Sequence, residues 1–442
     1  MTVNQNAPAR DTDQLPLLLV LNRFDDEFGE YHRFVPPGTH RLAYLATADA
    51  LAPLDRKGAV ATEVVEDMEY ETLLPAARRI VAEHGPLAGI IGLSEFDLVT
   101  TARLREELDA PGRRTEYVLR FRDKTRMKRW IHLAGVRAPK YRTLEGGALA
   151  EELVTEFGLP LILKPKDGAS AKGVLLIRTE PELAEALQGL DTGCYEAEEY
   201  VEGAVHHIDG IRRDGHFHFA TVSAYVNTCL DFTRGLPLGS VLLDPGPRRD
   251  ALLAFSADCL DALELWDGPF HLEVIVNSAG EHVFLEVGLR PGGAGVPFVH
   301  RDIFNIDLYG EAVRAALGLP PLTPPEELVQ PGPGVGAGWL VLPEPTPWPQ
   351  RVVARNSLVE AVPECYAEAL PHPGQVFTGD GGYDHAGGRF LFRGPDEATV
   401  RAAVLAGIAR YRLETTAADA PSDTSVSAAP ASAVATEAAG AR

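Results

Sequence analysis

The sequence predicts a protein of mixed class, α/β in its N-terminal part and α+β in the remainder. Two observations predict this division. Short apolar runs alternate with helical patterns up to about residue 115, and a second series of strand-like runs follows a helical stretch that begins at residue 123. The 442 residues give room for about three domains, and a hydrophobic content of 45% is ordinary for a globular protein.

The N-terminal part predicts a small parallel α/β domain at residues 15–115. The apolar runs "LPLLLVL", "RLAYLAT" and "LAGIIGL" predict buried strands, and "LLPAARRIVAEHG" predicts a helix that ends at Gly85. Strands separated by a helix favour parallel pairing.

The remainder predicts α+β structure. A helix over 123–135 is followed by strands at "LPLILKP", "GVLLIR", "CYEAEEYV", "FHLEVIV" and "HVFLEV", and the region extends to about residue 320. A Pro-rich linker then leads to a last α+β segment at 333–412, which closes with the helical pattern "DEATVRAAVLAGIARY". Residues 1–14 and 415–442 are polar or rich in Ala, Ser, Thr and Pro, so disorder is expected there.

Charge, apolar runs and cysteine spacing argue against several classes of protein. The formal net charge of −22 opposes binding to a nucleic-acid backbone. No apolar run approaches the roughly 20 residues that span a bilayer, so no membrane segment is expected. The cysteines form no CxxC pair, which favours reduced thiols in a cytoplasmic protein; they are Cys194, Cys229, Cys259 and Cys365.

Two glutamates interrupt apolar strands in "HLEVIVNSAGEHVFLEV". If Ala279 and Gly280 are the centre of a hairpin turn, Glu273 lies directly opposite Glu286. One face of the hairpin is then wholly apolar and includes Val274 and Leu285, while His271, Phe284, Gly288 and Arg290 share the face of the two acids.

Two opposed carboxylates would repel each other, because their Cβ atoms would be about 5 Å apart. A divalent cation between them accounts for the pair, and Mg²⁺ takes one or two carboxylates together with phosphate oxygens. An exposed strand face with two unrelated glutamates remains the alternative. A three-residue turn would leave the acids diagonal but on one face.

Three further stretches have the composition of a nucleotide site. Lys164 ends a strand and precedes a loop with Gly168, Ser170 and Gly173, where backbone N–H groups can approach a phosphate. The alternative is a plain hairpin. Further on, "EAEEYVEG" offers strand-edge groups for an adenine and carboxylates for a ribose, or else is a solvated edge. His207 and Asp209 then alternate on one strand face.

Four segments in a fixed order carry a resemblance to a known family. They are "DK" opening a helix, "LKP" with its Gly/Ser loop, "EEYVEG", and "HLEV" followed by "FLEVGLRPGG". Together they closely resemble the ATP-grasp superfamily of carboxylate–amine ligases, over roughly residues 15–412. The resemblance implies a Rossmann-like (pre-ATP-grasp) domain at 15–115, ATP-grasp subdomains at 116–200 and 201–320, and a C-terminal extension at 333–412.

The resemblance also implies the cofactors ATP and Mg²⁺, with two ions expected and Mn²⁺ as an alternative metal. Carried over to matching positions, the resemblance implies that Lys124 and Lys164 contact the ATP phosphates, and that the loop 168–173, with Ser170 and Lys172, closes over them. It assigns adenine and ribose to Glu198, Glu199 and Val201, and a ribose contact to His207 or Asp209. It assigns the metal to Glu273 and Glu286, and the phosphates and the acyl phosphate to Arg290. Two positions depart from the family pattern, since Gly288 replaces a metal-binding Asn and Val205 replaces a Glu.

The function that the resemblance implies is ATP-dependent joining of a carboxylate to an amine through an acyl phosphate, with ADP and phosphate as products. "FLEVGLRPGG", "HHIDG" and the C-terminal segment look most similar to the amino-acid ligases that make dipeptides. The expected partners are a small carboxylate and a small amine, with substrate-lining candidates Tyr225, Asn227, Phe232 and His300, and a homodimer as one expected assembly. Carboxylation or formylation of a metabolite, and a catalytically silent nucleotide-binding protein, remain the alternatives.

Overall fold

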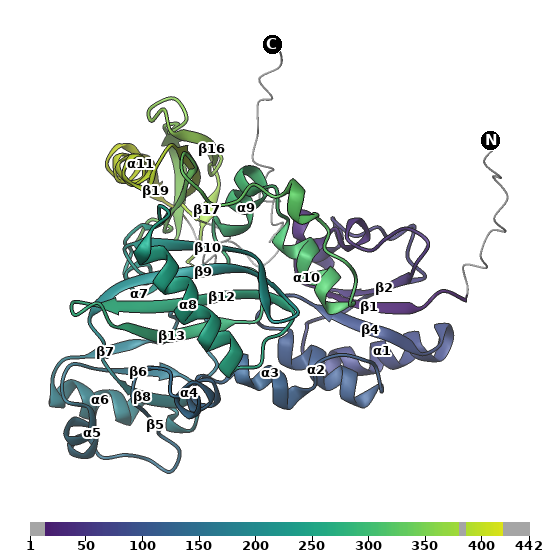
Figure 1. Ribbon diagram of the computed structural model, residues 1–442, viewed down its shortest axis with the longest axis horizontal. Helices are drawn as coiled ribbons and strands as arrows, with labels where there is room; N and C mark the ends of the chain where they lie inside the picture. Colours follow the sequence, from purple (N-terminus) through teal and green to yellow (C-terminus); the bar gives the residue numbers. More distant parts are fainter. Residues whose placement is uncertain (1–13, 380–385, 419–442) are drawn as a thin grey trace. The chain divides into compact units, whose positions relative to one another are not determined.

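The computed structural model describes residues 14–379 and 386–418, and the chain divides into two compact units (Figure 1). The first unit comprises Met1–Leu119 and Tyr309–Leu322, and the second comprises Arg120–Leu308 and Thr323–Arg442. Most of the two stretches expected to be disordered, 1–13 and 419–442, lies outside the described residues. In the parts that are described, no helix combines the length and the apolar content needed to cross a bilayer.

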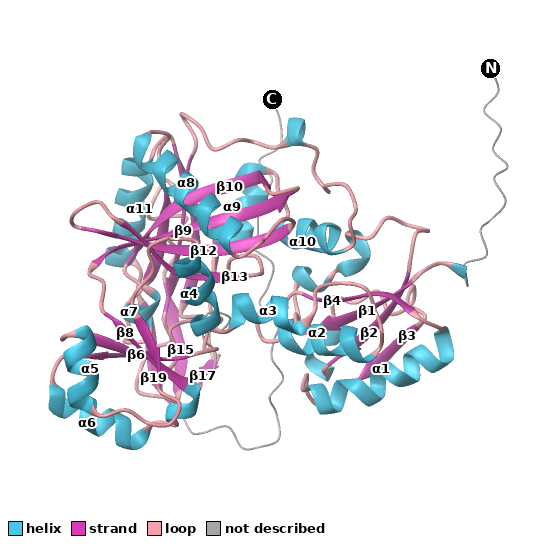
Figure 2. Cartoon of the chain, turned by 60° about the horizontal axis from the view of Figure 1, so that its bottom comes forward, coloured by secondary structure: helices cyan, strands magenta, loops and turns pink. Residues whose placement is uncertain are grey.

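A parallel four-stranded sheet in the order β3-β2-β1-β4 forms the centre of the first unit (Figure 2). Its strands are β1 (Leu17–Asn22), β2 (Arg41–Ala46), β3 (Ala61–Val64) and β4 (Leu87–Gly92), with helices α1 (Tyr70–His84) and α2 (Leu98–Glu107), and α3 (Thr115–Arg122) follows. The parallel pairing is as predicted, and Gly85 ends α1 at φ 95°. The sequence does not predict β3, because its four residues are only partly buried or exposed and form no apolar run.

Helix α10 (Leu308–Ala316) belongs almost entirely to the first unit, although the sequence places residues 201–320 in one subdomain. Its side chains Tyr309 and Val313 are buried in a core cluster with Tyr31 and Phe34 of the N-terminal segment. The predicted subdomain at 201–320 therefore includes a helix that belongs almost entirely to the first unit. An amphipathic helix does not indicate in its own sequence which core it joins.

Two sheets form the framework of the second unit. The smaller has the order β5-β8-β6-β7 and consists of β5 (Tyr141–Thr143), β6 (Leu161–Pro165), β7 (Leu175–Ile177) and β8 (Tyr195–Glu199), with α5 (Ala150–Phe157) and α6 (Glu180–Gly189). The larger has the order β13-β12-β9-β10-β11-β14-β18-β16 and consists of β9 (Gly203–Arg213), β10 (His216–Val226), β11 (Leu238–Leu242), β12 (Gly268–Asn277), β13 (His282–Gly288), β14 (Gly336–Leu342), β16 (Cys365–Ala369) and β18 (Gly388–Gly394). The helices are α4 (Lys124–Leu133), α7 (Cys229–Phe232), α8 (Pro247–Ala262), α9 (Val296–Phe304) and α11 (Glu397–Arg410). The predicted α+β class is confirmed.

The β12–β13 hairpin contains a longer turn than the sequence predicts. The N–H of Asn277 donates to the carbonyl of Glu281, so three residues, 278–280, form the turn instead of two. Farther from the turn, Glu273 nevertheless lies opposite Glu286, as predicted. The direct pairing of the two acids is thus confirmed, although the turn that was expected to produce it is different.

A bulge at Leu285 restores the pairing of the two acids. Val274 pairs with Phe284, whereas the preceding residue Glu273 pairs with Glu286, so Leu285 has no opposite residue. Between the turn and the bulge, side chains therefore exchange faces relative to the prediction. Phe284 is fully buried and Leu285 only partly so, and the predicted core position of Leu285 is wrong.

The C-terminal segment continues the larger sheet instead of forming a separate layer. β14 pairs with β11 on one side and with β18 on the other, and α11 packs against these strands. A small sheet in the order β17-β15-β19 lies beside it, made of β15 (Gln350–Arg355), β17 (Val376–Phe377) and β19 (Leu413–Ala417). Because Thr415 and Thr416 pair with β15, disorder does not begin at residue 415 as expected.

Candidate active site

Glu273 and Glu286 lie at the centre of the candidate site in the second unit. Glu273 is buried, and its Oε1 accepts a hydrogen bond of 2.8 Å from the hydroxyl of Tyr225 on β10. Glu286 is partly exposed, and its Oε2 lies 3.1 Å from the Nζ of Lys124. Two carboxylates and one cation therefore meet on one sheet face.

The electrostatics of this pair keep Glu286 ionised. Burial alone would raise the pKa of Glu286, but Lys124 and Lys164 outweigh burial and lower it to about 2. Two opposed carboxylates supply the hard oxygen ligands that Mg²⁺ takes, so the residues present fit this metal. Gly288, which pairs with His271, contributes no side-chain ligand to the same face.

Helix α4 brings Lys124 to the site at its first turn. Asp123 caps the helix by accepting hydrogen bonds from the N–H groups of Thr125 and Arg126. Lys124 Nζ then donates to the carbonyl of Gly168 at 2.5 Å in addition to its ion pair with Glu286. One lysine thus joins the glycine-containing loop to a candidate metal ligand.

The loop 168–173 has an unusual backbone. Ser170 and Ala171 both have positive φ values, 55° and 54°, and Gly173 follows at 76°. The N–H of Lys172 donates to the carbonyl of Ala169 at 3.1 Å, and the N–H of Val174 donates to that of Ala171 at 3.2 Å. Ser170 and Ala171 are thus the central residues of a tight turn between the antiparallel strands β6 and β7. The side chains of Ser170 and Lys172 are exposed, so the loop presents them to solvent.

Four charged side chains form a buried cluster between α4 and the smaller sheet. Lys128 Nζ lies 2.5 Å from Glu196 and 2.6 Å from Glu198, and Lys164 Nζ lies 2.8 Å from Glu198. Burial raises the pKa of Glu196. For Glu198, Lys128 and Lys164 outweigh burial and lower the pKa. Burial would lower the pKa of Lys164, but the carboxylates, Glu198 first, raise it above its ordinary value.

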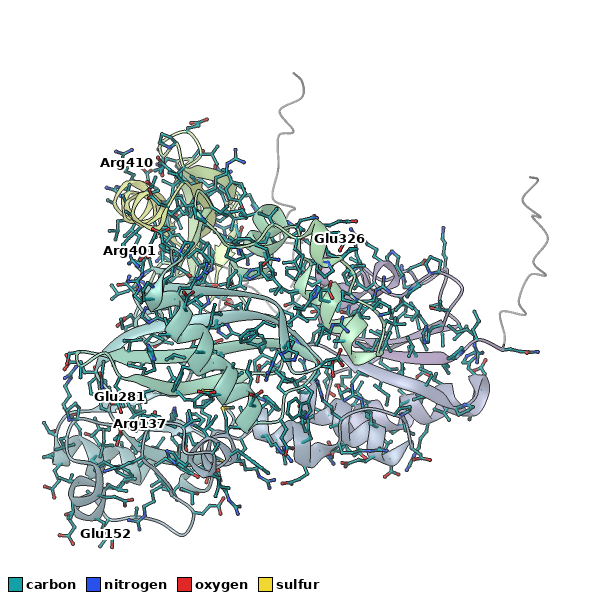
Figure 3. The ribbon with its side chains drawn as sticks, viewed as in Figure 1. Arg137, Glu152, Glu281, Glu326, Arg401 and Arg410 are labelled. Atoms are coloured by element: carbon teal, nitrogen blue, oxygen red, sulfur yellow. The ribbon has the colours of Figure 1, made fainter. Side chains whose placement is uncertain are left out.

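The predicted adenine stretch follows directly. Glu199 forms an ion pair with Arg137, which also lies 3.5 Å from Glu281 at the hairpin turn (Figure 3). Val201 is partly buried and Tyr200 is exposed, at the point where β8 ends. Of the residues predicted to bind the nucleotide, Lys164 and Glu198 contact each other directly, at 2.8 Å.

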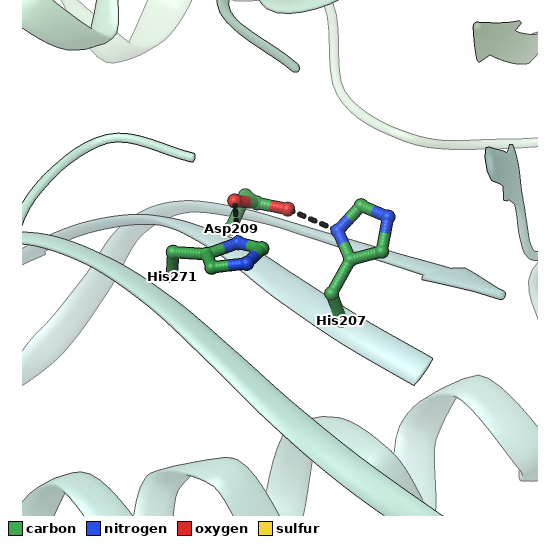
Figure 4. Close-up of side chains that lie close together, drawn as sticks. All are labelled: His207, Asp209 and His271. Carbon is green, nitrogen blue, oxygen red and sulfur yellow. Dashed lines mark hydrogen bonds and ion pairs between the residues drawn. The ribbon is translucent and has the colours of Figure 1, made fainter. Parts of the chain in front are cut away.

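His207, Asp209 and His271 form a hydrogen-bonded chain in which the first two residues are buried and His271 is mostly so (Figure 4). Asp209 Oδ2 lies 2.5 Å from Nδ1 of His207, and its Oδ1 lies 2.7 Å from Nδ1 of His271. Nε2 of His271 lies 3.5 Å from Glu273, and Nε2 of His207 lies 2.6 Å from Ser240. The network therefore extends from the candidate metal ligand into the sheet, and both oxygens of Asp209 are occupied within it.

The substrate-lining candidates divide into two pairs. Tyr225 touches Glu273, and His300 lines a small pocket together with His207, Ser240 and Trp339. Asn227 donates instead to the carbonyl of Pro237, and Phe232 ends the short helix α7; neither lines this pocket.

Arg290 follows β13 at the start of the "RPGGAG" segment. Its Nη1 donates to the carbonyl of Pro291 at 2.8 Å. Gly292 lies against Asp209, because a Cβ there would be 2.2 Å from Oδ1 of Asp209. The segment is therefore packed directly onto the histidine–aspartate chain.

The sequence reasoning assigned no role to Lys128 or His271. The one signal for His271 is that the predicted strand pattern places it on the same face as Glu273. Lys128 stands one helical turn after Lys124, and this spacing was its one signal.

Comparisons with known proteins show what this chain is similar to. No protein-family model matches the sequence. The chain is 24% identical over 280 residues to the L-arginine-specific L-amino acid ligase of Bacillus subtilis, covering 61% of this chain and 68% of that protein. It is 27% identical over 290 residues to carnosine synthase 1 of Mus musculus, covering 60% of this chain and 34% of that protein.

The solved structure of an L-amino acid ligase from Bacillus licheniformis shares the fold, with a TM-score of 0.69 and 17% identity, over 90% of this chain and 98% of that chain. The protein thus has the fold of the ATP-grasp ligases. The chain is thus similar in sequence, and in fold, to proteins named as amino acid ligases.

Proposed function

We propose that this chain joins the carboxylate of one amino acid to the amine of another at the expense of ATP, releasing ADP and phosphate. The observation that carries the proposal is the opposed pair Glu273 and Glu286, with Lys124 on one acid and Lys164 among the neighbouring charges. The names of the matched proteins, two amino-acid ligases and a carnosine synthase, support the choice of substrate class.

The chemistry requires activation of the carboxylate, because its oxygen is a poor leaving group. Transfer of the γ-phosphoryl group of ATP to a carboxylate oxygen gives an acyl phosphate. The amine then attacks the carbonyl carbon, the phosphate leaves, and the nitrogen loses a proton. A reaction of this kind depends mainly on positioning and on stabilising the negative charge of the phosphoryl oxygens.

The chain's own residues account for these requirements. Glu273 and Glu286 would hold Mg²⁺, which when bound neutralises phosphate oxygens; two ions, or Mn²⁺ in their place, are the finer form of this proposal. Lys124 and Lys164 bind ATP phosphates, and Arg290 binds the phosphoryl group in transit.

Nucleotide recognition is assigned to the first ATP-grasp subdomain. Glu199 and Val201 bind adenine and ribose at the end of β8. Glu198 is buried with both carboxylate oxygens on Lys128 and Lys164, so its role is to position Lys164 instead of contacting the nucleotide directly. Loop 168–173, with Ser170 and Lys172 exposed on it, closes over the phosphates and excludes water, since an acyl phosphate hydrolyses.

His207 and Asp209 have a role that differs from the ribose contact expected from the sequence. Both side chains are buried, and Asp209 binds two imidazoles. We assign them, with His271, to orienting Glu273, which His271 approaches at 3.5 Å.

His300 lines a small cavity beside His207 that has room for about one water molecule. Nδ1 of His300 is 2.7 Å from a backbone carbonyl and Nε2 is 3.0 Å from Thr221, and burial lowers the pKa of His300. The cavity is too small for an amino-acid side chain, so we do not propose it as a substrate site. Because the reaction consumes ATP and none of the four cysteines forms a disulfide, we propose that the protein acts in the cytoplasm, with a homodimer as the proposed assembly.

The test is phosphate release from ATP and Mg²⁺ with a panel of amino acids, added singly and in pairs, with the nucleotide products resolved. ADP and phosphate that form with a particular pair support the proposal and name both substrates. AMP and pyrophosphate overturn the acyl-phosphate route. Bicarbonate- or formate-dependent ADP release identifies a carboxylation or formylation instead, and tight ATP binding without turnover on any substrate identifies a silent binder.

A further inference from the structure

Lys128 is a buried lysine to which the proposed reaction gives no direct task. Its side chain is 1% exposed, as are few lysines in folded proteins. It lies one turn after Lys124 on α4, but it points to β8 of the smaller sheet, where it contacts Glu196 and Glu198. Both acids are also buried.

Lys128 and Lys164 share the same two carboxylates. Glu198 accepts from Lys128 on Oε2 and from Lys164 on Oε1, at 2.6 and 2.8 Å. Glu196 accepts from Lys128 at 2.5 Å, and the same oxygen lies 4.0 Å from Lys164. The other oxygen of Glu196 has no hydrogen-bond partner among the described residues.

The charges of this cluster balance only if both lysines are present. Two ammonium groups face two carboxylates in a buried environment, where the interaction between charges is much stronger than in water. Without Lys128, Lys164 would face both acids alone, and the cluster would gain one unit of negative charge. An anionic phosphate would then be repelled, and Lys164 would be held more tightly by the acids.

We propose that Lys128 is a positioning residue that neutralises the Glu196–Glu198 pair and so leaves Lys164 available to nucleotide phosphate. The inference rests on the proposed function, because it takes Lys164 as a phosphate ligand. It gives α4 two functions: Lys124 faces the candidate metal pair, and Lys128 sets the charge around the second phosphate lysine.

A set of charge-changing variants tests this role. The variants are Lys128→Met, Glu196→Gln and the double variant, and the probe is a non-hydrolysable ATP analogue with Mg²⁺, measured by calorimetry. We expect Lys128→Met to bind the analogue about tenfold more weakly, Glu196→Gln to bind it at least as tightly as wild type, and the double variant to bind it within about threefold of wild type. Lys128→Arg, which keeps the charge, should remain close to wild type.

The rescue distinguishes charge from packing. If the double variant binds as weakly as Lys128→Met, the lysine acts through packing and the proposal is overturned. Tenfold weaker binding by Glu196→Gln also overturns it. If Lys128→Met does not fold, as judged by thermal unfolding, the same binding criteria are applied to Glu196→Gln and the double variant. Neither of these two variants contains the Glu196 carboxylate, so neither buries that charge without a compensating lysine.

Lys164→Met separates this inference from the proposed function. Weak binding by Lys164→Met together with wild-type binding by Lys128→Met overturns the positioning role alone. Wild-type binding by Lys164→Met overturns the assignment of Lys164 to phosphate, and with it both proposals for this lysine.

Discussion

Glu273 and Glu286 lie directly opposite each other because the bulge at Leu285 compensates for the three-residue turn of their hairpin. Without the bulge, Glu273 would face Leu285, and Glu286 would point to the opposite, apolar face. The extra residue instead places both carboxylates on one sheet face, where Glu273 contacts Tyr225 of β10 and Glu286 contacts Lys124 of α4. Bulges are frequent beside active sites for this reason.

Replacing either acid by its amide should remove activity and leave the fold intact. Glu273→Gln and Glu286→Gln each lose a negative metal ligand while keeping their volume, so ADP release should fall by about 100-fold or more. The measurement is substrate-dependent ADP release, with thermal unfolding to verify the fold.

The matched control for these variants is Glu326→Gln, an exposed acid in a short 3₁₀ turn (Figure 3), which should keep wild-type turnover. Retained activity in either Glu273→Gln or Glu286→Gln contradicts the metal assignment.

Asp209→Asn should destabilise the protein markedly. Asp209 accepts from two imidazoles, whereas an asparagine has one acceptor oxygen and an NH₂ group that would face an N–H of His207 or His271. Leaving one buried donor unpaired should lower the free energy of unfolding by about 2–4 kcal/mol. Urea unfolding at pH 7 measures this change.

The control for Asp209→Asn is Asp214→Asn, in the exposed β9–β10 turn at φ 50°. Asparagine tolerates this backbone conformation, so the urea midpoint should stay within error of wild type. Equal midpoints for the two variants would show that the buried network does not contribute to stability.

Gly292→Ala and Gly293→Ala should differ although they are neighbours. A Cβ at Gly292 would lie 2.2 Å from Asp209 Oδ1 and 2.9 Å from Val296 Cγ1, while a Cβ at Gly293 meets nothing within 4 Å. We expect Gly292→Ala to lower the free energy of unfolding by about 1–3 kcal/mol, and Gly293→Ala to change it by less than about 0.5 kcal/mol. Thermal unfolding of the two variants in parallel is the measurement, and equal stability contradicts the packing of this segment.

His206 should make the protein less stable as the pH falls. Burial lowers the pKa of His206 from 6.5 to about 4. The unfolded chain therefore takes up the proton first, and stability declines as the pH falls from about 6.5 to about 4. His206→Gln keeps an N–H donor for the carbonyl of Ala204, which lies 3.2 Å from Nδ1 of His206.

The variant should therefore gain up to about 3 kcal/mol relative to wild type as the pH falls from 7 to 4. Urea unfolding at several pH values measures the difference. Parallel stability curves for His206→Gln and wild type would contradict the assignment.

Sequence reasoning succeeded where local pattern alone decides the structure. The apolar runs around Leu19, Tyr44 and Ile90 predicted three buried strands of the first unit. The direct pairing of Glu273 with Glu286 was also predicted, but it results from two unpredicted features that compensate each other, the three-residue turn and the bulge. Sequence reasoning did not succeed where distant segments meet. Nothing near Tyr309 indicates that α10 packs with Tyr31, and no pattern around Leu285 indicates a bulge.

By itself, the sequence determined the fold class and the order of the chemical motifs, and it predicted the residues at the centre of the candidate site. These follow from periodicity and from the chemistry of side chains a few positions apart. Only the tertiary structure decided that Lys128 shares its acids with Lys164, and that Asp209 binds His271 instead of facing a ligand. The physical reason is that buried charges are fixed by partners from other strands and helices, about 70 residues away for Lys128 and Glu198 and about 60 for Asp209 and His271.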